Sequence, residues 1–308
     1  MIPKIKNERN EEMAALFDIP DNKKIRVIVD TDAACEADDP FAIVHALISP
    51  KLIVKGITAE HYNEEGSVQK SYEEIRTILE LMQMDMPFFM GEEHALISAD
   101  QKGTSEAVDF IISEALREDE HPLYILCQGA ITNVAAAFNK SPDIIDKVTV
   151  IWIGTHGEQT VAPFREFNAG NDIISANKVL SSGTNLWLVP SDVYTTITIG
   201  IAEIQNDVLP CGAIGRHLFE NMISYNNSEF AGWTQGESWS LGDSPAIAIA
   251  INPGCGHFKE IEAPTICEDT SSKKNDGAKK QQSIRMYTDV DSRYVIGDFI
   301  AKLKLFTS

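Results

Sequence analysis

The stretch VIVDTDAACEADDPFAIVHAL, residues 27–47, decides the fold because it joins an apolar strand directly to a helix. Its first residues are a β-branched run typical of a buried strand, and DDPFAIVHAL has the apolar spacing of a helix. The next apolar run, LIVKGITA at residues 52–59, returns to strand character. Together the three segments predict a βαβ unit with two parallel strands.

The alternation of strands and helices continues along the chain. Helical patterns follow at residues 67–83, 105–118, 132–139 and 172–182, and strand patterns at 86–91, 122–129, 147–154, 185–192 and 284–291. Strands buried on both faces indicate a parallel sheet covered by helices. We therefore predict an α/β fold with a mostly parallel central sheet flanked by helices, in a single domain over residues 1–308. Within it, residues 1–23 are an N-terminal extension and the polar segment 268–283 is an exposed loop.

Composition excludes several classes of partner. The chain has 308 residues, of which 44% are hydrophobic, so it can bury a large core. Its formal net charge of −20 argues against nucleic acid and against membrane surfaces as partners, because both attract basic patches. No apolar run resembles a secretory signal or is long enough to span a bilayer, and we expect a cytoplasmic protein. The five cysteines lack paired spacing, which predicts neither a disulfide framework nor a zinc site.

Five acids crowd the turn that follows the first strand: Asp30, Asp32, Glu36, Asp38 and Asp39. Like charges this close repel one another, and local structural propensity offers no compensation. Hard divalent cations bind carboxylate oxygens and would offset the repulsion. The sequence therefore predicts a metal site at the end of this strand.

Other polar residues follow the ends of other predicted strands. Asn63 follows the second strand, Thr132 follows the strand at 122–129, and Glu166 and Asn168 lie in the loop after the strand at 147–154. Ligands of open parallel sheets bind beyond the carboxyl ends of the strands. Each residue alone could cap a helix or close a turn, but their convergence at one edge predicts a binding site.

Two enzyme families compete for the opening motif. In the haloacid-dehalogenase-like phosphohydrolases, a DxD after the first strand supplies a nucleophile and an acid, and a later GD segment helps to hold magnesium. Asp30-Thr31-Asp32 and Gly242-Asp243 are superficially similar to these two motifs. No second acid closely follows Asp243, however, and Asp38 and Asp39 stay unexplained, so this family is the alternative hypothesis.

The chain more closely resembles the nucleoside hydrolases, the inosine-uridine-preferring nucleoside ribohydrolase family. The resemblance runs from residue 24 to about residue 306 and rests on six ordered blocks. They are VDTDAACEADDPFAI, GITAEHYN, CQGAITNVAAAF, REFNAGNDIISANKVLSSG, LVPSDVY and LGDSPAIA. The resemblance implies calcium-dependent hydrolysis of the N-glycosidic bond of ribonucleosides, giving ribose and a free nucleobase.

The resemblance also assigns the residues of the metal site. Asp32, Asp39 and Asp243 supply carboxylate ligands to calcium, and Thr132 supplies a backbone carbonyl. Asp38 is the general base, which takes a proton from the water that attacks the anomeric carbon. The acids are crowded, on this hypothesis, because a dication and a proton transfer both need them.

Three further residues, Asn63, Glu166 and Asn168, are assigned to the hydroxyls of the ribose. Asp30 is expected to orient the metal loop without binding the ion, and Glu36 to be an exposed loop acid. We also expect a homo-oligomer, either a dimer or a tetramer.

The chain departs from the family pattern at the aspartate cluster and just before the last metal aspartate, among other positions. The usual cluster has the form DxDPGxDD, whereas DTDAACEADD is two residues longer and lacks the Pro-Gly pair. Many members carry an aromatic residue or histidine just before the last metal aspartate, where this chain has Gly242. Residues that could instead protonate the leaving base are His61, His156, Tyr225, Trp233 and Trp239. A calcium-dependent ribose-binding or nucleoside-binding protein without turnover is the non-enzymatic alternative.

Overall fold

An eight-stranded sheet forms the centre of the protein, whose computed structural model describes residues 17–158, 162–274 and 283–308. Across the sheet the strands are β3 (Phe88–Met90), β2 (Leu52–Ala59), β1 (Ile25–Thr31), β4 (Leu123–Cys127), β5 (Val148–Ile153), β6 (Asn185–Val189), β12 (Ser283–Val290) and β9 (Gly256–Glu262). All neighbouring pairs are parallel except β12 and β9. The predicted α/β fold with a mostly parallel central sheet is confirmed.

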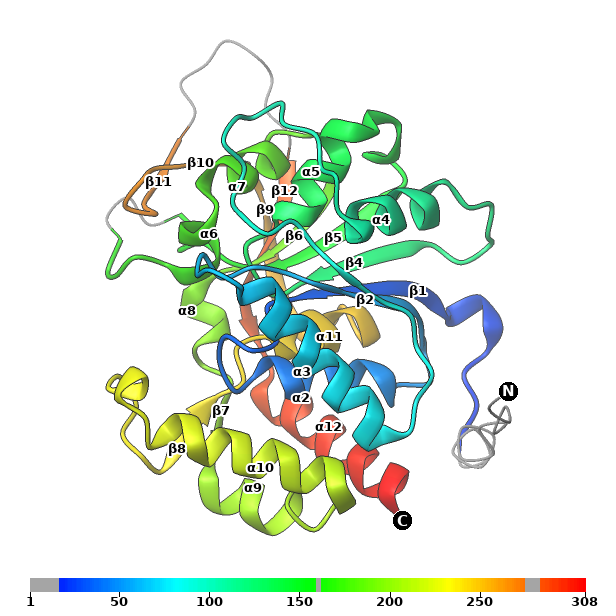
Figure 1. Ribbon diagram of the computed structural model, residues 1–308, viewed down its shortest axis with the longest axis vertical. Coiled ribbons are helices and arrows are strands. Elements are labelled where there is room, and N and C mark those ends of the chain that lie inside the picture. Colours follow the sequence, from blue (N-terminus) through cyan, green and yellow to red (C-terminus); the bar gives the residue numbers. More distant parts are fainter. Residues whose placement is uncertain (1–16, 159–161, 275–282) are drawn as a thin grey trace.

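Helices cover both faces of this sheet (Figure 1). On one face lie α2 (Asp39–Leu47), α3 (Ser67–Met82), α11 (Ser244–Ile251) and α12 (Ser292–Thr307), and on the other α4 (Glu106–Leu116), α5 (Thr132–Lys140) and α7 (Ile173–Leu180). Two short helices, α6 (Phe167–Asn171) and α8 (Ser191–Tyr194), follow β5 and β6. Each face of the sheet packs its own hydrophobic cluster against these helices.

A smaller unit extends beyond the first helical layer (Figure 1). It consists of the antiparallel hairpin β7 (Thr198–Gly200) and β8 (Ser238–Ser240) with α9 (Ile201–Asp207) and α10 (Gly212–Asn226). Neither this hairpin nor the antiparallel edge strand β9 was predicted from the sequence. No helix in the described ranges is both long and apolar enough to cross a membrane.

The chain between residues 268 and 283 differs in part from the predicted exposed loop. A second hairpin, β10 (Thr265–Ile266) with β11 (Ser272–Lys273), buries Thr270, Ser271 and Ser272. Polar residues can be buried when they are hydrogen-bonded. The Ser272 hydroxyl, for example, donates to the Gly157 carbonyl at 2.6 Å. Residues 275–282 and the first sixteen residues of the predicted N-terminal extension lie outside the described ranges.

Strand order fixes where a ligand can bind. Going outward from β1, the chain runs through β2 and β3 in one direction and through β4, β5 and β6 in the other. The order therefore reverses between β1 and β4, and a crevice opens beyond the carboxyl ends of strands at such a point. β1 is buried along its whole length, and it delivers the aspartate-rich loop into this crevice.

Asn133 connects the strands on either side of the crevice. Its side-chain amide donates to Asp30 Oδ1 at 2.9 Å and to the Ala59 carbonyl at 3.1 Å, and its side-chain oxygen accepts from the Glu92 N–H at 2.8 Å. All three bonds are to β1, β2 or the segment after β3. A single buried side chain on α5 thus holds the site's framework together.

Asn133→Ala should lower the free energy of unfolding by about 2–4 kcal/mol, because it leaves buried donors and acceptors without partners. Denaturant unfolding of the variant measures the change. Asn206→Ala, at an exposed position on α9, is the matched control and should stay within about 0.5 kcal/mol of the parent. Equal stabilities of the two variants would contradict the role given to Asn133.

Candidate active site

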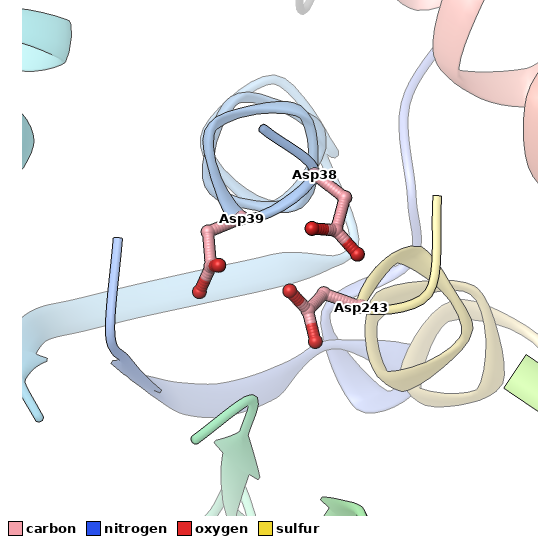
Figure 2. A group of neighbouring side chains, drawn as sticks. All are labelled: Asp38, Asp39 and Asp243. Carbon is pink, nitrogen blue, oxygen red and sulfur yellow. The ribbon is translucent and has the colours of Figure 1, made fainter. Parts of the chain in front are cut away.

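Three buried carboxylates meet where α2 and α11 begin. Asp38 and Asp39 lie at the N-terminal end of α2, and Asp243 precedes the first residue of α11. One oxygen of each carboxylate lies within 4.8 Å of the other two, and all three side chains are buried. Figure 2 shows the three carboxyl groups pointing toward one another from these two helix ends. The predicted residues Asp38, Asp39 and Asp243 are therefore brought together.

The local sequence explains why both helices start here. A proline follows each acidic start, Pro40 in α2 and Pro245 in α11, at a position where its missing N–H costs nothing. Unpaired N–H groups and the helix dipole make a helix N-terminus favourable for negative charge. α11 is apolar around its circumference and buried from residue 244 to residue 250, as is typical of a helix enclosed in the core.

The acid cavity, of about 80 Å³, lies between these helix ends and the ends of β1 and β4. Its lining includes all three carboxylates together with Asp32, Gln128 and Asn168. Asp32 Oδ2 and both polar side-chain atoms of Gln128 are buried and have no hydrogen-bond partner among the described residues. Buried polar atoms without partners are rare in folded proteins, and here they border a cavity that a ligand could fill.

Burial and mutual repulsion make these acids hard to ionise. Burial raises the pKa of Asp38 to about 6, although hydrogen bonds from the backbone of Gly242 and Asp243 counter part of the rise. Burial, and next the charge of Asp38, raises the pKa of Asp39 to about 7. The pKa values of Asp32 and Asp243 are also raised by burial and by Asp39. The cluster therefore needs either protons or a cation.

Asp30 lies outside the acid cavity, in the layer beneath it. Its Oδ1 accepts hydrogen bonds from the Thr58 hydroxyl at 2.6 Å and from Asn133. Burial raises the pKa values of Asp30 and Glu60, which are close enough to hydrogen-bond through a shared proton. This placement agrees with a supporting role for Asp30, because its carboxyl group faces other protein groups.

Thr132 and Asn63 are not brought into the cavity. The Thr132 hydroxyl donates to Asp172 at 2.8 Å and also hydrogen-bonds His61 Nε2. As the first residue of α5, its backbone carbonyl is directed along the helix. Asn63 is exposed, with a positive φ of 61°, and lines neither the acid cavity nor the aromatic cavity described below.

Glu166 and Asn168 have structural hydrogen bonds. Glu166 is fully buried and caps α6, with its Oε2 accepting from the N–H groups of Thr155 at 2.9 Å and Ala169 at 2.8 Å. Its Oε1 accepts from the Tyr194 hydroxyl at 2.8 Å. Asn168 does line the acid cavity, while its amide donates to the Gln128 carbonyl at 3.0 Å. Of this pair, only Asn168 can reach a ligand in the acid cavity directly.

Sequence analysis missed five residues that line the acid cavity: Cys35, Gln128, Ile153, Phe167 and Tyr194. It also described Glu36 as an exposed loop acid, but Glu36 is half-buried and lines the cavity, and burial raises its pKa to about 8. Gln128 lies directly after β4, where the strand order reverses. This position could have identified it as a site residue.

A second, larger cavity of about 600 Å³ adjoins the first and shares Cys35, Glu36 and Phe167 with it. We call it the aromatic cavity, because its lining also includes Tyr62, Tyr225, Phe230, Trp233 and Trp239. Flat rings stack favourably on such side chains. The two cavities together form an acidic pocket that opens beside an aromatic one.

The residues proposed to protonate a leaving base differ in position. His156 hydrogen-bonds Ser191 and the Phe164 carbonyl through its two ring nitrogens, and His61 has a pKa lowered to about 4 by burial. Neither histidine lines the acid cavity or the aromatic cavity, whereas Tyr225, Trp233 and Trp239 line the aromatic one. The two histidines are therefore poorly placed for this role.

Packing explains why residue 242 is glycine. A Cβ at Gly242 would lie 3.1 Å from Asp38 Oδ2 and 3.2 Å from the Tyr194 ring. These contacts are tighter than usual, so a side chain there would require the carboxylate of Asp38 or the ring of Tyr194 to shift by a few tenths of an ångström. Packing therefore favours glycine at this position.

A hard divalent cation fits the donor set of the acid cavity. The polar groups that line it are mainly carboxylate and amide oxygens, which calcium prefers, and no histidine is among the described residues of its lining. A dication would offset the repulsion among the acids and would give the unpaired oxygen of Asp32 a partner.

The ion-free protein should lose thermal stability as the pH rises from about 5 to about 8. A carboxyl group whose pKa is raised by folding binds its proton more tightly in the folded state, so stability falls between the unfolded and folded pKa values. Added calcium should raise the melting temperature more at the higher pH, where fewer protons compete. Melting curves of ion-depleted protein at several pH values test this expectation. Asp243→Asn should reduce the change of melting temperature with pH, and an unchanged pH dependence in that variant would contradict the expectation.

The sequence is also similar to a known protein family and to curated relatives. Residues 27–297 match the family model of the inosine-uridine preferring nucleoside hydrolases. The chain is 29% identical over 257 residues to the pyrimidine-specific ribonucleoside hydrolase RihA of Salmonella paratyphi C, covering 74% of this chain and 79% of that protein. It is also 29% identical over 199 residues to an uncharacterized protein of Schizosaccharomyces pombe, covering 55% of this chain and 62% of that one.

Solved structures show the same fold. A purine-preferring ribonucleoside hydrolase from Gardnerella vaginalis superposes with a TM-score of 0.76 at 20% identity, covering 92% of this chain and 99% of that one. A plant nucleoside hydrolase gives a TM-score of 0.74 at 20% identity, covering 91% and 99%. Because the family model matches most of its length, the chain belongs to the inosine-uridine preferring nucleoside hydrolase family.

Proposed function

We propose that this protein hydrolyses the N-glycosidic bond of ribonucleosides in a calcium-dependent reaction that gives ribose and the free nucleobase. Family membership supports the reaction class. The observation that carries the calcium dependence is the meeting of buried Asp38, Asp39 and Asp243 beside an unpaired oxygen of Asp32. Without a cation, this many carboxylates in one small cavity are difficult to keep ionised.

The ion would be held by Asp32, Asp39 and Asp243, as the resemblance implies. We infer that the backbone carbonyl of Gln128 takes the place predicted for Thr132, because Gln128 lines the acid cavity and Thr132 does not. When bound, calcium supplies positive charge that neutralises the carboxylates, orients the sugar hydroxyls and makes water easier to deprotonate.

Asp38 acts as general base in this proposal. Oxygen of the attacking water bonds the anomeric carbon while Asp38 takes its proton, and the electron pair of the breaking C–N bond passes to the nucleobase, which takes up a proton from solvent. Asp32 is the competing choice, since its Oδ2 has no protein partner whereas backbone groups already hydrogen-bond Asp38. The variants below distinguish the two.

The ribose would contact Asn168, which lines the acid cavity. Glu166 contributes indirectly, because its carboxylate holds Tyr194 and the start of α6 in place. Asn63 stays a prediction that requires its loop to close over the substrate. The departing base would lie in the aromatic cavity, which shares its boundary residues with the acid cavity. Cytoplasmic location and homo-oligomeric assembly also stay predictions.

A panel of inosine, uridine, guanosine, adenosine and cytidine tests the activity through release of reducing sugar. Exhaustive chelation should abolish turnover, and calcium should restore it. Full activity after chelation would contradict the calcium dependence. Calcium-induced thermal stabilisation without release of sugar would instead favour the non-catalytic binder, and hydrolysis of an aryl phosphate would favour the phosphohydrolase alternative.

Asp38→Asn should leave calcium binding intact and lower kcat by about 10²–10⁴, because the amide cannot accept the proton. Asp39→Asn should instead lose the calcium-induced rise in melting temperature. Both are isosteric, so titration calorimetry with calcium compares them directly. If Asp38→Asn loses calcium while Asp32→Asn keeps it without turnover, the base is Asp32.

A nitrophenyl riboside should be cleaved much faster than any natural nucleoside of the panel, because its leaving group needs no protonation and Gly242 supplies none. The ratio of the two kcat/KM values is the relevant measure, since it reports stabilisation of the transition state. Equal values for the riboside and a natural nucleoside would show that the chain has an effective general acid.

A further inference from the structure

The loop at residues 32–38 separates the acid cavity from the aromatic cavity. It contains the two residues by which this chain exceeds the usual family pattern, and it forms neither helix nor strand before Asp39. Cys35 and Glu36 are half-buried and line both cavities. A turn bond from the Cys35 N–H to the Asp32 carbonyl, 2.7 Å long, links the half-buried part of the loop to a predicted metal ligand.

Tyr225 holds this loop from a distant part of the chain. Its hydroxyl donates to the Ala34 carbonyl at 2.9 Å and also contacts the Cys35 carbonyl. The residue is the last but one of α10, and its own carbonyl accepts bonds from the N–H and hydroxyl of Ser228 at 2.9 Å and 2.7 Å. The end of α10 is therefore fixed where it meets the loop.

The same side chain belongs to the wall of the aromatic cavity. The Tyr225 ring packs edge to face on Trp239, with ring centroids 6.4 Å apart and an interplanar angle of 73°. A tyrosine hydroxyl has one hydrogen, and here two loop carbonyls share it. That hydrogen is not free for a nucleobase, so the direct role considered for Tyr225 from the sequence conflicts with these contacts.

We propose that Tyr225 is a positioning residue that ties the longer aspartate loop to the wall of the aromatic cavity and thereby sets the geometry of the calcium site. The proposal rests on the proposed function for the calcium site and for the catalytic consequence, but not for the contacts of Tyr225 with the loop. Loss of the hydroxyl would release the carbonyls of Ala34 and Cys35, and the loop would then hold Asp32 less firmly. Both binding of the ion and turnover would suffer.

Tyr225→Phe tests this because it keeps the ring and removes the hydroxyl. Calcium affinity, measured by titration calorimetry, should fall at least threefold. The kcat/KM values should fall about tenfold, by the same factor for a natural nucleoside and for the nitrophenyl riboside, since the loop serves both. Tyr294→Phe, which removes a half-buried hydroxyl from α12, is the matched control and should change neither quantity.

A third measurement needs neither calcium nor activity. Alkylation of Cys35 by iodoacetamide in ion-free protein, followed by mass spectrometry of the peptide, reports how firmly the loop is held. The rate should rise at least threefold in Tyr225→Phe and stay unchanged in Tyr294→Phe. This result can support the proposal even if the protein cleaves no nucleoside.

Two outcomes would overturn the proposal. If Tyr225→Phe slows natural nucleosides far more than the nitrophenyl riboside and leaves calcium affinity unchanged, Tyr225 acts on the leaving base. If Cys35 alkylation and calcium affinity both match the parent protein, the hydroxyl does not position the loop.

Discussion

Repulsion among buried carboxylates is the constraint on which the rest of the structure depends. Asp32, Asp38, Asp39 and Asp243 border one small cavity, and burial makes every one of them hard to ionise. Two helix N-termini and a hydrogen bond from Thr31 to Asp39 offset part of this cost. A bound dication would offset the rest of the repulsion among the carboxylates. This repulsion is therefore the source both of the electrostatic cost of folding and of the proposed chemistry.

The framework beneath the cavity keeps the acids from moving apart. Asp30 and Glu60 form a second buried acidic layer, and Asn133 bonds to both of them as well as to the backbone at the end of β2. Mobile carboxylates could relieve their repulsion by turning toward solvent, and the site would then lose its selectivity for a cation. The rigid layer prevents this, which is why supporting polar residues lie in the core where apolar ones would otherwise pack.

Sequence patterns predicted the parts of the fold that depend on local periodicity. β1, α2 and the aspartate loop follow from one continuous stretch, and the strands that meet at the crevice are all apolar runs of ordinary length. The antiparallel strand β9 was missed because it is an edge strand with mostly exposed side chains, so it lacks the apolar signal of the central strands. The hairpin of β7 and β8 has only three residues in each strand, too few for a pattern.

Site residues were predictable in type but not always in orientation. Which group at the end of β4 faces the cavity depends on the turn at Ile131, whose φ of 63° is unusual for a β-branched residue and cannot be inferred from its neighbours. Glu166 was assigned to the ribose, yet a carboxylate before a helix can equally cap it, and here it does. Long-range contacts, such as that of Tyr225 with the aspartate loop, cannot be predicted from the local sequence.

The packing around Gly242 connects two features that are separate in the sequence. A side chain at residue 242 would lie in close contact with Asp38 and with the ring of Tyr194, and Glu166 holds Tyr194 through its hydroxyl. An arrangement that fixes the proposed base in this way disfavours a side chain at residue 242, and glycine offers no acid. Stabilisation of the departing group must then come from elsewhere, and the aromatic cavity can provide it by stacking, which requires no proton transfer. On this argument the missing acid and the firmly held base are two consequences of one packing arrangement.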